Sequence, residues 1–225
     1  MDVLAIIAAG GTGERAGASL PKQYVEINGK PILAHTIDKF EESVYVKQIV
    51  LVAPAGFLDE TKLIVGQYAY SKVAAVVAGG ETRQCSVYNG LKHANGFSCG
   101  KVLVHDAARP FVTQTDIRNV VEAIGETGCA ILAAPVTDSI IQLDECGNTA
   151  TQNRDTLYAV QTPQGFDFQF LVEAHRAAAA SGFNGHDDSA LTERMGIRTK
   201  LVRGGYHNLK LTTAQDMLLA ELLLK

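Results

Sequence analysis

Short apolar runs alternate with amphipathic stretches over the first 135 residues of the chain. The apolar runs, rich in Val, Ile, Leu and Ala, predict strands at Val3–Ala8, Gln48–Ala53, Val73–Ala78, Lys101–His105 and Ala130–Ala134. The stretches between them predict helices at Pro31–Glu42, Leu58–Tyr68, Glu81–Ala94 and Thr115–Thr127. Strands that are apolar on both faces are typical of a parallel sheet covered by helices. The pattern therefore predicts an α/β, Rossmann-like domain with a mostly parallel central sheet.

The pattern changes after Pro135. Val136–Leu143 and Thr149–Val160 predict two extended segments around Asp144–Asn148, which has the composition of a hairpin turn. A two-stranded ribbon is marginally stable alone, so we expect a β-arm at about residues 136–160 to dock on a second copy of the chain. A flap on a monomer would give the same pattern. Helical patterns return at Phe168–Ala180, Asp188–Met195 and Thr213–Leu224. We expect residues 1–225 to form a single domain that carries this arm.

Composition narrows the class of protein. The 225 residues are 47% hydrophobic and 20% charged, as in ordinary globular proteins, and the net charge of −4 argues against a sequence-independent nucleic-acid binder. No run approaches the roughly 18 apolar residues of a membrane span, and no signal-peptide pattern is seen. The four cysteines have no C-x-x-C spacing, so we expect reduced thiols and a cytoplasmic protein without a membrane partner.

A cationic glycine loop follows the first predicted strand. It reads Ala8-Ala9-Gly10-Gly11-Thr12-Gly13-Glu14-Arg15, and Pro21-Lys22-Gln23-Tyr24 comes shortly after it. Closely spaced glycines let backbone N–H groups approach a phosphate, and Arg15 and Lys22 add positive charge. Ligands of parallel sheets bind beyond the carboxyl ends of the strands, where His105–Pro110 also lies. The loop therefore predicts a nucleoside triphosphate site.

Other interpretations of the loop fit less well. Gly11-x-Gly13-x-x-Ala16 matches the dinucleotide fingerprint, and an NAD-dependent dehydrogenase remains a distant alternative. In that motif a helix opens at once and the second strand follows early, whereas here Pro21 interrupts the helix and the next predicted strand begins near residue 48. The P-loop pattern is absent. A turn that only joins strand to helix would leave Arg15 and Lys22 unexplained.

Six blocks along the chain resemble the cytidylyltransferases that make CDP-polyols. They are Ala8–Tyr24, Gly79–Val87, Val104–Pro110, Arg154 with Gln161–Gln164, Asp187-Asp188, and Asn208–Thr212. They follow the order of that family over nearly the whole chain, and they are most similar to its 2-C-methyl-D-erythritol 4-phosphate branch. The resemblance implies an enzyme that transfers a cytidylyl group from CTP to this acceptor. The products would be 4-diphosphocytidyl-2-C-methyl-D-erythritol, an isoprenoid precursor of the non-mevalonate pathway, and pyrophosphate.

The resemblance also implies roles for individual residues. The catalytic cations would be Arg15, Lys22 and Lys210. The CTP-binding residues would be Ala8, Ala9, Gly10, Gly11, Thr12, Gly13, Gly80, Glu81 and Ser86. The residues that bind the polyol phosphate would be Asp106, Arg109, Ser139, Arg154, Thr162 and Asp187, with Ser139 and Arg154 reaching across a homodimer. A Mg²⁺ ion would bind the phosphates beside Asp106, as hard cations prefer oxygen ligands.

Several alternatives stay open. The acceptor could be ribitol 5-phosphate, as in another branch of the family, or the chain could be a catalytically silent sugar-nucleotide binding module. Lys210 could be a solvated surface charge, Asp106 and Arg109 a local salt bridge, and Ser86 an ordinary buried serine. The glycine loop is one residue longer than is usual in the family. His186 stands where threonine is usual, and an exposed helix start with acidic residues in its first turn fits His186–Asp188 better than a metal site does.

Overall fold

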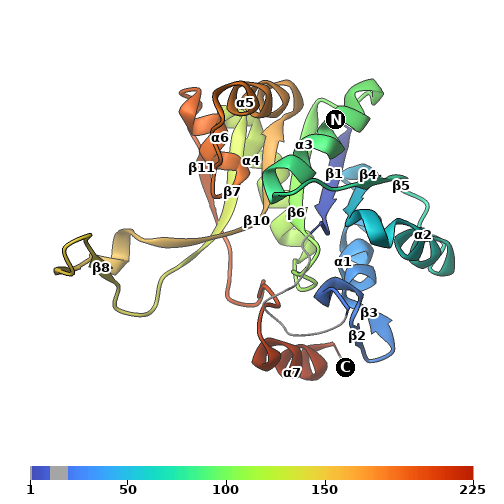
Figure 1. The fold of residues 1–225 in the computed structure, drawn as a ribbon, viewed down its shortest axis with the longest axis horizontal. Coiled ribbons are helices and arrows are strands. Elements are labelled where there is room, and N and C mark those ends of the chain that lie inside the picture. The colour runs from blue at the N-terminus through green and yellow to red at the C-terminus, as the bar shows by residue number, and fades with distance from the viewer. Residues whose placement is uncertain (1, 11–19, 225) are drawn as a thin grey trace.

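The computed structural model describes residues 2–10 and 20–224. Within these ranges seven strands form one central sheet in the order β11-β7-β10-β6-β1-β4-β5 (Figure 1). The strands are β1 (Val3–Ala8), β4 (Val46–Ala53), β5 (Val73–Ala78), β6 (Lys101–Asp106), β7 (Cys129–Pro135), β10 (Tyr158–Asp167) and β11 (Lys200–Arg203). Neighbouring strands pair in parallel, except that β10 is antiparallel to both β6 and β7. The predicted α/β fold with a mostly parallel sheet is confirmed.

Strand β1 shows why its residues are apolar without interruption. Val3, Ala5 and Ile7 lie in the hydrophobic core on one face of the sheet, whereas Leu4 and Ile6 lie in the core on the other face. Because side chains alternate along a strand, a strand between two covered faces needs an apolar residue at every position. Both faces of the sheet at β1 are therefore closed to water.

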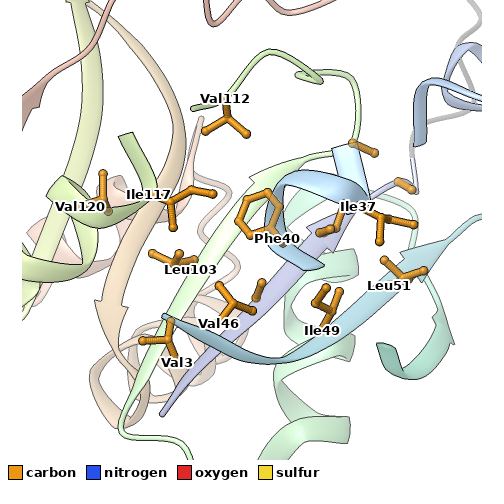
Figure 2. Close-up of a cluster of buried hydrophobic side chains, with 14 of the residues drawn as sticks. Val3, Ile37, Phe40, Val46, Ile49, Leu51, Leu103, Val112, Ile117 and Val120 are labelled. Atoms are coloured by element: carbon orange, nitrogen blue, oxygen red, sulfur yellow. The ribbon is translucent and has the colours of Figure 1, made fainter. Parts of the chain in front are cut away.

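Helices cover the two faces. The described helices are α1 (Ile32–Glu41), α2 (Leu58–Gln67), α3 (Arg83–His93), α4 (Gln114–Thr127), α5 (Phe168–Ser181), α6 (Asp188–Arg194) and α7 (Ala214–Leu223). Helices α1, α2 and α4 contribute to the first core, part of which is drawn in Figure 2, with Phe40 of α1 near Leu103 of β6. Helices α3 and α5 contribute to the second core. No helix in the described ranges is long and apolar enough to cross a membrane.

Local chemistry fixes several helix ends. Helix α7 begins at a capping box between Thr213 and Asp216, and α4 begins at another between Thr113 and Asp116. Helix α4 ends at Gly128, whose φ of 80° lies in the left-handed region that favours glycine. Helix α3 begins two residues later than predicted, at Arg83, because the Thr82 hydroxyl caps it by accepting from the Cys85 N–H.

A long arm projects from the body of the molecule, with β8 near its tip (Figure 1). The arm carries a short antiparallel pair, β8 (Ile141–Leu143) and β9 (Thr149–Thr151), joined by a turn in which the Asp144 carboxylate accepts from the backbone N–H groups of Cys146 and Asn148. The predicted hairpin is confirmed as an antiparallel pair of strands joined by a turn, although its strands are shorter than predicted.

The prediction of one extended segment over Thr149–Val160 is wrong. Strand β9 ends at Thr151, a 3-10 turn follows at Arg154–Thr156, and the chain then enters the central sheet as β10 between β6 and β7. The strand was not predicted because its middle, Gln161–Gln164, is polar, whereas the prediction relied on runs of apolar residues. Strand β11 and the short pair β2 (Glu26–Ile27) and β3 (Lys30–Pro31) were also not predicted.

The C-terminal helix α7 lies against β2 and the start of α1. Ala220 of α7 joins Ile27, Ile32 and Leu211 in a small apolar cluster, and the Asn28 amide donates to the Glu221 carbonyl over 3.3 Å. The segment just before α7 lies at the carboxyl edge of the sheet, where the Leu211 N–H donates to the Ala108 carbonyl over 2.8 Å.

Candidate active site

A cavity of about 460 Å³ opens at the carboxyl ends of β1 and β6. Ala8 and Asp106, the last residues of these two strands, are register partners and both line it. The lining residues are Ala8, Ala9, Gly10, Lys22, Gln23, Gly80, Glu81, Thr82, Arg83, Ser86, Asp106, Ala107, Ala108 and Lys210. Lys22 and Lys210 thus come from opposite ends of the chain to one cavity, as the sequence predicts for a site that binds a polyphosphate.

Two glycine segments meet at the back of this cavity. A Cβ atom on Gly10 would lie 2.7 Å from the Ser86 hydroxyl oxygen, and one on Gly79 would lie 2.8 Å from the same oxygen. That oxygen accepts from the Gly80 N–H over 3.1 Å and donates to the Thr82 carbonyl over 2.9 Å. Ser86 is 2% exposed, so its hydroxyl holds the glycine turn in place from behind.

Lys22 lies on a short, well-anchored segment. The 3-10 helix Lys22–Tyr24 contains Gln23, whose side-chain amide donates to the Ala9 carbonyl over 2.5 Å. The Tyr24 hydroxyl is 2.8 Å from the Thr61 hydroxyl, and its ring stacks on Phe57 with centroids 4.9 Å apart. These contacts fix the backbone that carries Lys22 to the wall of the cavity.

Asp106 is the electrostatic centre of the site. Its Oδ1 accepts from Arg83 Nε over 3.0 Å, and its Oδ2 lies 2.7 Å from Lys210 Nζ and 3.8 Å from Arg109 Nε. Burial by itself would raise the pKa of Asp106, but Arg83, Lys210 and Arg109 together hold that pKa far below its usual range. Asp106 therefore stays ionised and is surrounded by three positively charged side chains.

Arg109 lies behind this carboxylate and is not among the residues that line the cavity. Its side chain is 11% exposed, and its Nη1 donates to the Asn208 carbonyl over 2.7 Å. Burial lowers the pKa of Arg109, and Asp106 partly restores it. The structure thus supports the local salt bridge, and contact between Arg109 and a substrate phosphate stays a prediction.

Thr162 lies in β10 inside the body of the molecule, not on the arm. Its buried hydroxyl accepts from the Asp106 N–H over 3.1 Å and lies 3.1 Å from His105 Nδ1. Burial lowers the pKa of His105 to about 4, so this ring is neutral at ordinary pH. Thr162 therefore braces the end of β6, and its predicted contact with substrate stays a prediction.

Ser139 and Arg154 belong to the arm and lie outside the cavity of their own copy. Both are exposed, and Arg154 Nη1 donates to the Thr137 carbonyl over 2.8 Å. Their predicted contact with the site of a second copy stays a prediction.

Asp187 and Asp188 differ from each other. Asp187 caps α6, with its carboxylate accepting from the Ala190 N–H over 3.0 Å. The expectation of an exposed helix start is wrong for Asp188, which is 1% exposed and accepts from Arg83 Nη1 over 2.6 Å and from His175 Nε2 over 3.1 Å. The partners that bury it come from distant parts of the chain, so its environment was invisible in the local pattern.

Four predicted residues, Gly11, Thr12, Gly13 and Arg15, lie outside the described residues. Among the described residues, no group of three or more His, Cys, Asp or Glu side chains is arranged to hold a metal ion. Of the residues that the structure describes, Asp106 and Glu81 are the carboxylates that line the cavity. Because Mg²⁺ keeps several water ligands and needs only one or two carboxylates beside phosphate oxygens, this donor set fits a phosphate-bound Mg²⁺.

Sequence reasoning missed Arg83 and Gln23 as parts of the site, although both belong to the blocks that carry the resemblance. The position of Arg83 in the sequence could have pointed to its role. Arg83 occupies the first position of a helix, where a positive charge opposes the helix dipole, so an arginine there calls for nearby carboxylates. Gln23 gave no such indication, because its partner is a backbone carbonyl.

The chain is similar to known proteins over its full length. The family model for 2-C-methyl-D-erythritol 4-phosphate cytidylyltransferase matches residues 3–225. The enzyme of that name from Halalkalibacterium halodurans is 42% identical over 224 residues, covering 100% of this chain and 97% of the relative. The one from Desulforamulus reducens is 41% identical over 228 residues, covering 100% and 96%.

Solved structures agree with these relatives. The 4-diphosphocytidyl-2C-methyl-D-erythritol synthase from Anaerococcus prevotii superposes with a TM-score of 0.87 at 30% identity, covering 100% of this chain and 96% of the other. The cytidylyltransferase from Thermus thermophilus has a TM-score of 0.78 at 32% identity, covering 98% and 97%. With this cavity, this sheet and these relatives, the chain belongs to the 2-C-methyl-D-erythritol 4-phosphate cytidylyltransferase family.

Proposed function

We propose that this protein transfers the cytidylyl group of CTP to 2-C-methyl-D-erythritol 4-phosphate. The products are 4-diphosphocytidyl-2-C-methyl-D-erythritol and pyrophosphate. The observation that carries the proposal is the meeting of Lys22 and Lys210 in one cavity with Asp106, beside a glycine turn held by Ser86. Membership of the family supports the choice of both substrates and does not favour a dehydrogenase or a ribitol 5-phosphate enzyme.

The reaction needs positioning more than acid–base chemistry. An oxygen of the acceptor's phosphate attacks the α-phosphorus of CTP, and the bond from that phosphorus to the oxygen bridging the α- and β-phosphates breaks. The acceptor phosphate is largely ionised at neutral pH, because the second pKa of a phosphate monoester is about 6. The barrier lies in bringing two anions together and in stabilising the charge that develops on the α-phosphate.

Cations of this chain lower that barrier. Lys22 and Arg15 would hold the triphosphate, and Lys210 would neutralise the α-phosphate and the incoming phosphate. Gly80, Glu81 and Ser86 lie on the glycine-turn side of the cavity, where the cytosine would bind. Each of these roles follows the family pattern, and for the described residues the common cavity supports it.

We also propose that the enzyme uses Mg²⁺, held by Asp106 together with the substrate phosphates. When bound, the ion would neutralise phosphate charge and polarise the phosphoryl oxygens. Removing divalent ions with EDTA should abolish pyrophosphate release and added Mg²⁺ should restore it. Full activity in EDTA would contradict this part of the proposal.

A homodimer in the cytoplasm completes the proposal. The arm exposes Ile141 and Leu143, each by more than 60%, on a two-stranded ribbon that has little packing of its own. The four cysteines are unpaired, which suits a reducing compartment.

The direct test measures pyrophosphate release with each of the four nucleoside triphosphates and with two acceptors. CTP with 2-C-methyl-D-erythritol 4-phosphate should be the fastest pair. Faster turnover of ribitol 5-phosphate would show that the proposed acceptor is wrong and that ribitol 5-phosphate is the substrate. Indifference to CTP, together with thermal stabilisation by NAD, would overturn the reaction class.

A further inference from the structure

Arg83 joins two buried carboxylates from different parts of the chain. Its Nε donates to Asp106 Oδ1 over 3.0 Å, and its Nη1 donates to Asp188 Oδ2 over 2.6 Å. Asp106 is 8% exposed and Asp188 is 1% exposed. A planar guanidinium bound at two of its nitrogens has a fixed orientation, which a flexible ammonium does not.

The guanidinium is itself held from behind. Asp188 Oδ1 lies 3.1 Å from Nε2 of the fully buried His175, and the His175 ring stacks on Tyr88 with centroids 5.6 Å apart. Tyr88 lies on α3, the helix that Arg83 begins, whereas His175 lies on α5 and Asp188 begins α6. These contacts therefore connect α3, α5 and α6 to one another, and through Arg83 they connect all three helices to Asp106.

Lys210 binds the same carboxylate in a different way. Its Nζ is 2.7 Å from Asp106 Oδ2, but its side chain is 40% exposed and lies at the cavity wall. In the proposed reaction Lys210 must turn to phosphate oxygens, and its contact with Asp106 then weakens. Arg83, 29% exposed and bound on the opposite carboxylate oxygen, can remain.

We infer that Arg83 is a positioning residue that acts through Asp106. With Asp188 and His175 behind it, Arg83 fixes the Asp106 carboxylate at the end of β6 and compensates its charge, so that Lys210 is free to exchange Asp106 for phosphate. The inference rests on the proposed function, because it is the incoming phosphates that draw Lys210 away.

The alternative is that Arg83 only joins α6 to α3 and stabilises the fold. The two roles separate in a double-mutant cycle on kcat/KM for the polyol phosphate. The variants are Arg83→Gln, Arg83→Lys, Asp106→Asn and the double variant Arg83→Gln/Asp106→Asn, with the thermal midpoint measured for each. Arg176→Gln is the matched control, since Arg176 is an exposed arginine beside His175 on α5.

A positioning role predicts that Arg83→Gln lowers kcat/KM for the polyol phosphate by roughly 100-fold, the cost of a small misplacement of a reacting group. KM for CTP should change much less. Arg83→Lys should recover part of the loss, because it restores the charge. The double variant should be no slower than Asp106→Asn alone, since residues that act as a unit are not additive. Arg176→Gln should match the wild type.

Losses that multiply in the double variant would overturn the inference, as would wild-type turnover in Arg83→Gln. If Arg83→Gln does not fold, Arg83→Lys with Asp106→Asn gives the same cycle with the charge kept. A crystal structure of the Arg83 variant supplies a readout independent of the acceptor, and the Asp106 carboxylate should leave its present position. A carboxylate that stays in place overturns the inference, whereas a wild-type enzyme inert with CTP overturns the proposed function instead.

Discussion

At the scale of single residues, Lys22 and Lys210 carry the argument for polyphosphate chemistry. A lysine at an arbitrary position is usually a solvated charge, but these two line one cavity from opposite ends of the chain. Their positive charge is already in place before a nucleotide binds, so little reorganisation is needed when negative charge develops on the α-phosphate.

Lys22→Ala tests this assignment. We expect kcat to fall by roughly 100-fold or more, the effect of removing one preorganised charge donor, while the thermal midpoint changes little. Initial rates of pyrophosphate release and a thermal melt measure the two quantities. Lys47→Ala, on an exposed position of β4, is the control and should leave both unchanged. Near-normal turnover in Lys22→Ala would refute the role of this lysine.

Ser86 makes a second residue-scale prediction. Its hydroxyl satisfies the Gly80 N–H, so Ser86→Ala leaves a partly buried donor without its partner. We expect the free energy of unfolding to fall by about 1–3 kcal/mol and KM for CTP to rise, with kcat largely kept, because the glycine turn lies at the base side of the cavity. Urea denaturation and steady-state kinetics measure both. Ser181→Ala, at the exposed end of α5, is the control. An unchanged KM for CTP would show that Ser86 has no role in nucleotide binding.

At the scale of elements, α6 is held to α3 and α5 by the carboxylate of Asp188. Burial by itself would raise the pKa of Asp188, but Arg83 and His175 hold that pKa below its ordinary value. The folded protein thus binds this proton less tightly than the unfolded chain does. The carboxylate therefore stabilises the fold above the unfolded pKa of about 3.9, and that stability is lost as the pH falls through the folded pKa.

Asp188→Asn should lower the free energy of unfolding by about 3 kcal/mol at pH 7, because it leaves the partly buried Arg83 with one carboxylate instead of two. The gap between variant and wild type should narrow below about pH 4, because Asp188 is protonated in the unfolded wild-type chain at a higher pH than in the folded protein. Urea denaturation between pH 3 and pH 7 measures the gap. Asp59→Asn is the control, since that carboxylate is 94% exposed. A gap that stays constant with pH would contradict the assigned ion pair.

At the scale of the whole molecule, the arm projects away from the body (Figure 1). Ser139 and Arg154 belong to this arm and are not among the residues that line the cavity of their own copy. If the proposed dimer builds each active site from both copies, two inactive variants should complement each other. Mixing Lys22→Ala with Arg154→Ala under conditions of subunit exchange should restore about a quarter of wild-type activity, because half of the dimers are mixed and one site in each is intact.

The control for this experiment comes from the same cavity. Lys22 and Lys210 line one cavity within one copy, so mixing Lys22→Ala with Lys210→Ala should restore nothing. Sedimentation gives the mass of the wild type. A monomer, or equal results from the two mixtures, would rule out a shared site.

The sequence by itself determined the elements whose signal is local. β1 and β5 match their predicted ranges residue for residue, although β1 is buried and the edge strand β5 is only partly buried, because a continuous apolar run is recognised from its own residues. The glycine loop, Lys22 and Lys210 were likewise identified from their own neighbourhoods and from the family pattern.

Only the tertiary structure decided what depends on partners far along the chain. The middle of β10 is polar, yet Thr162 and Gln164 are buried there because backbone N–H groups of Asp106 and Ser189 donate to them. In the same way the Arg83 guanidinium lies between Asp106 and Asp188, which are 82 positions apart in the sequence. A buried polar group is stable only beside its partner, and no local pattern of residues states which partner the fold will supply.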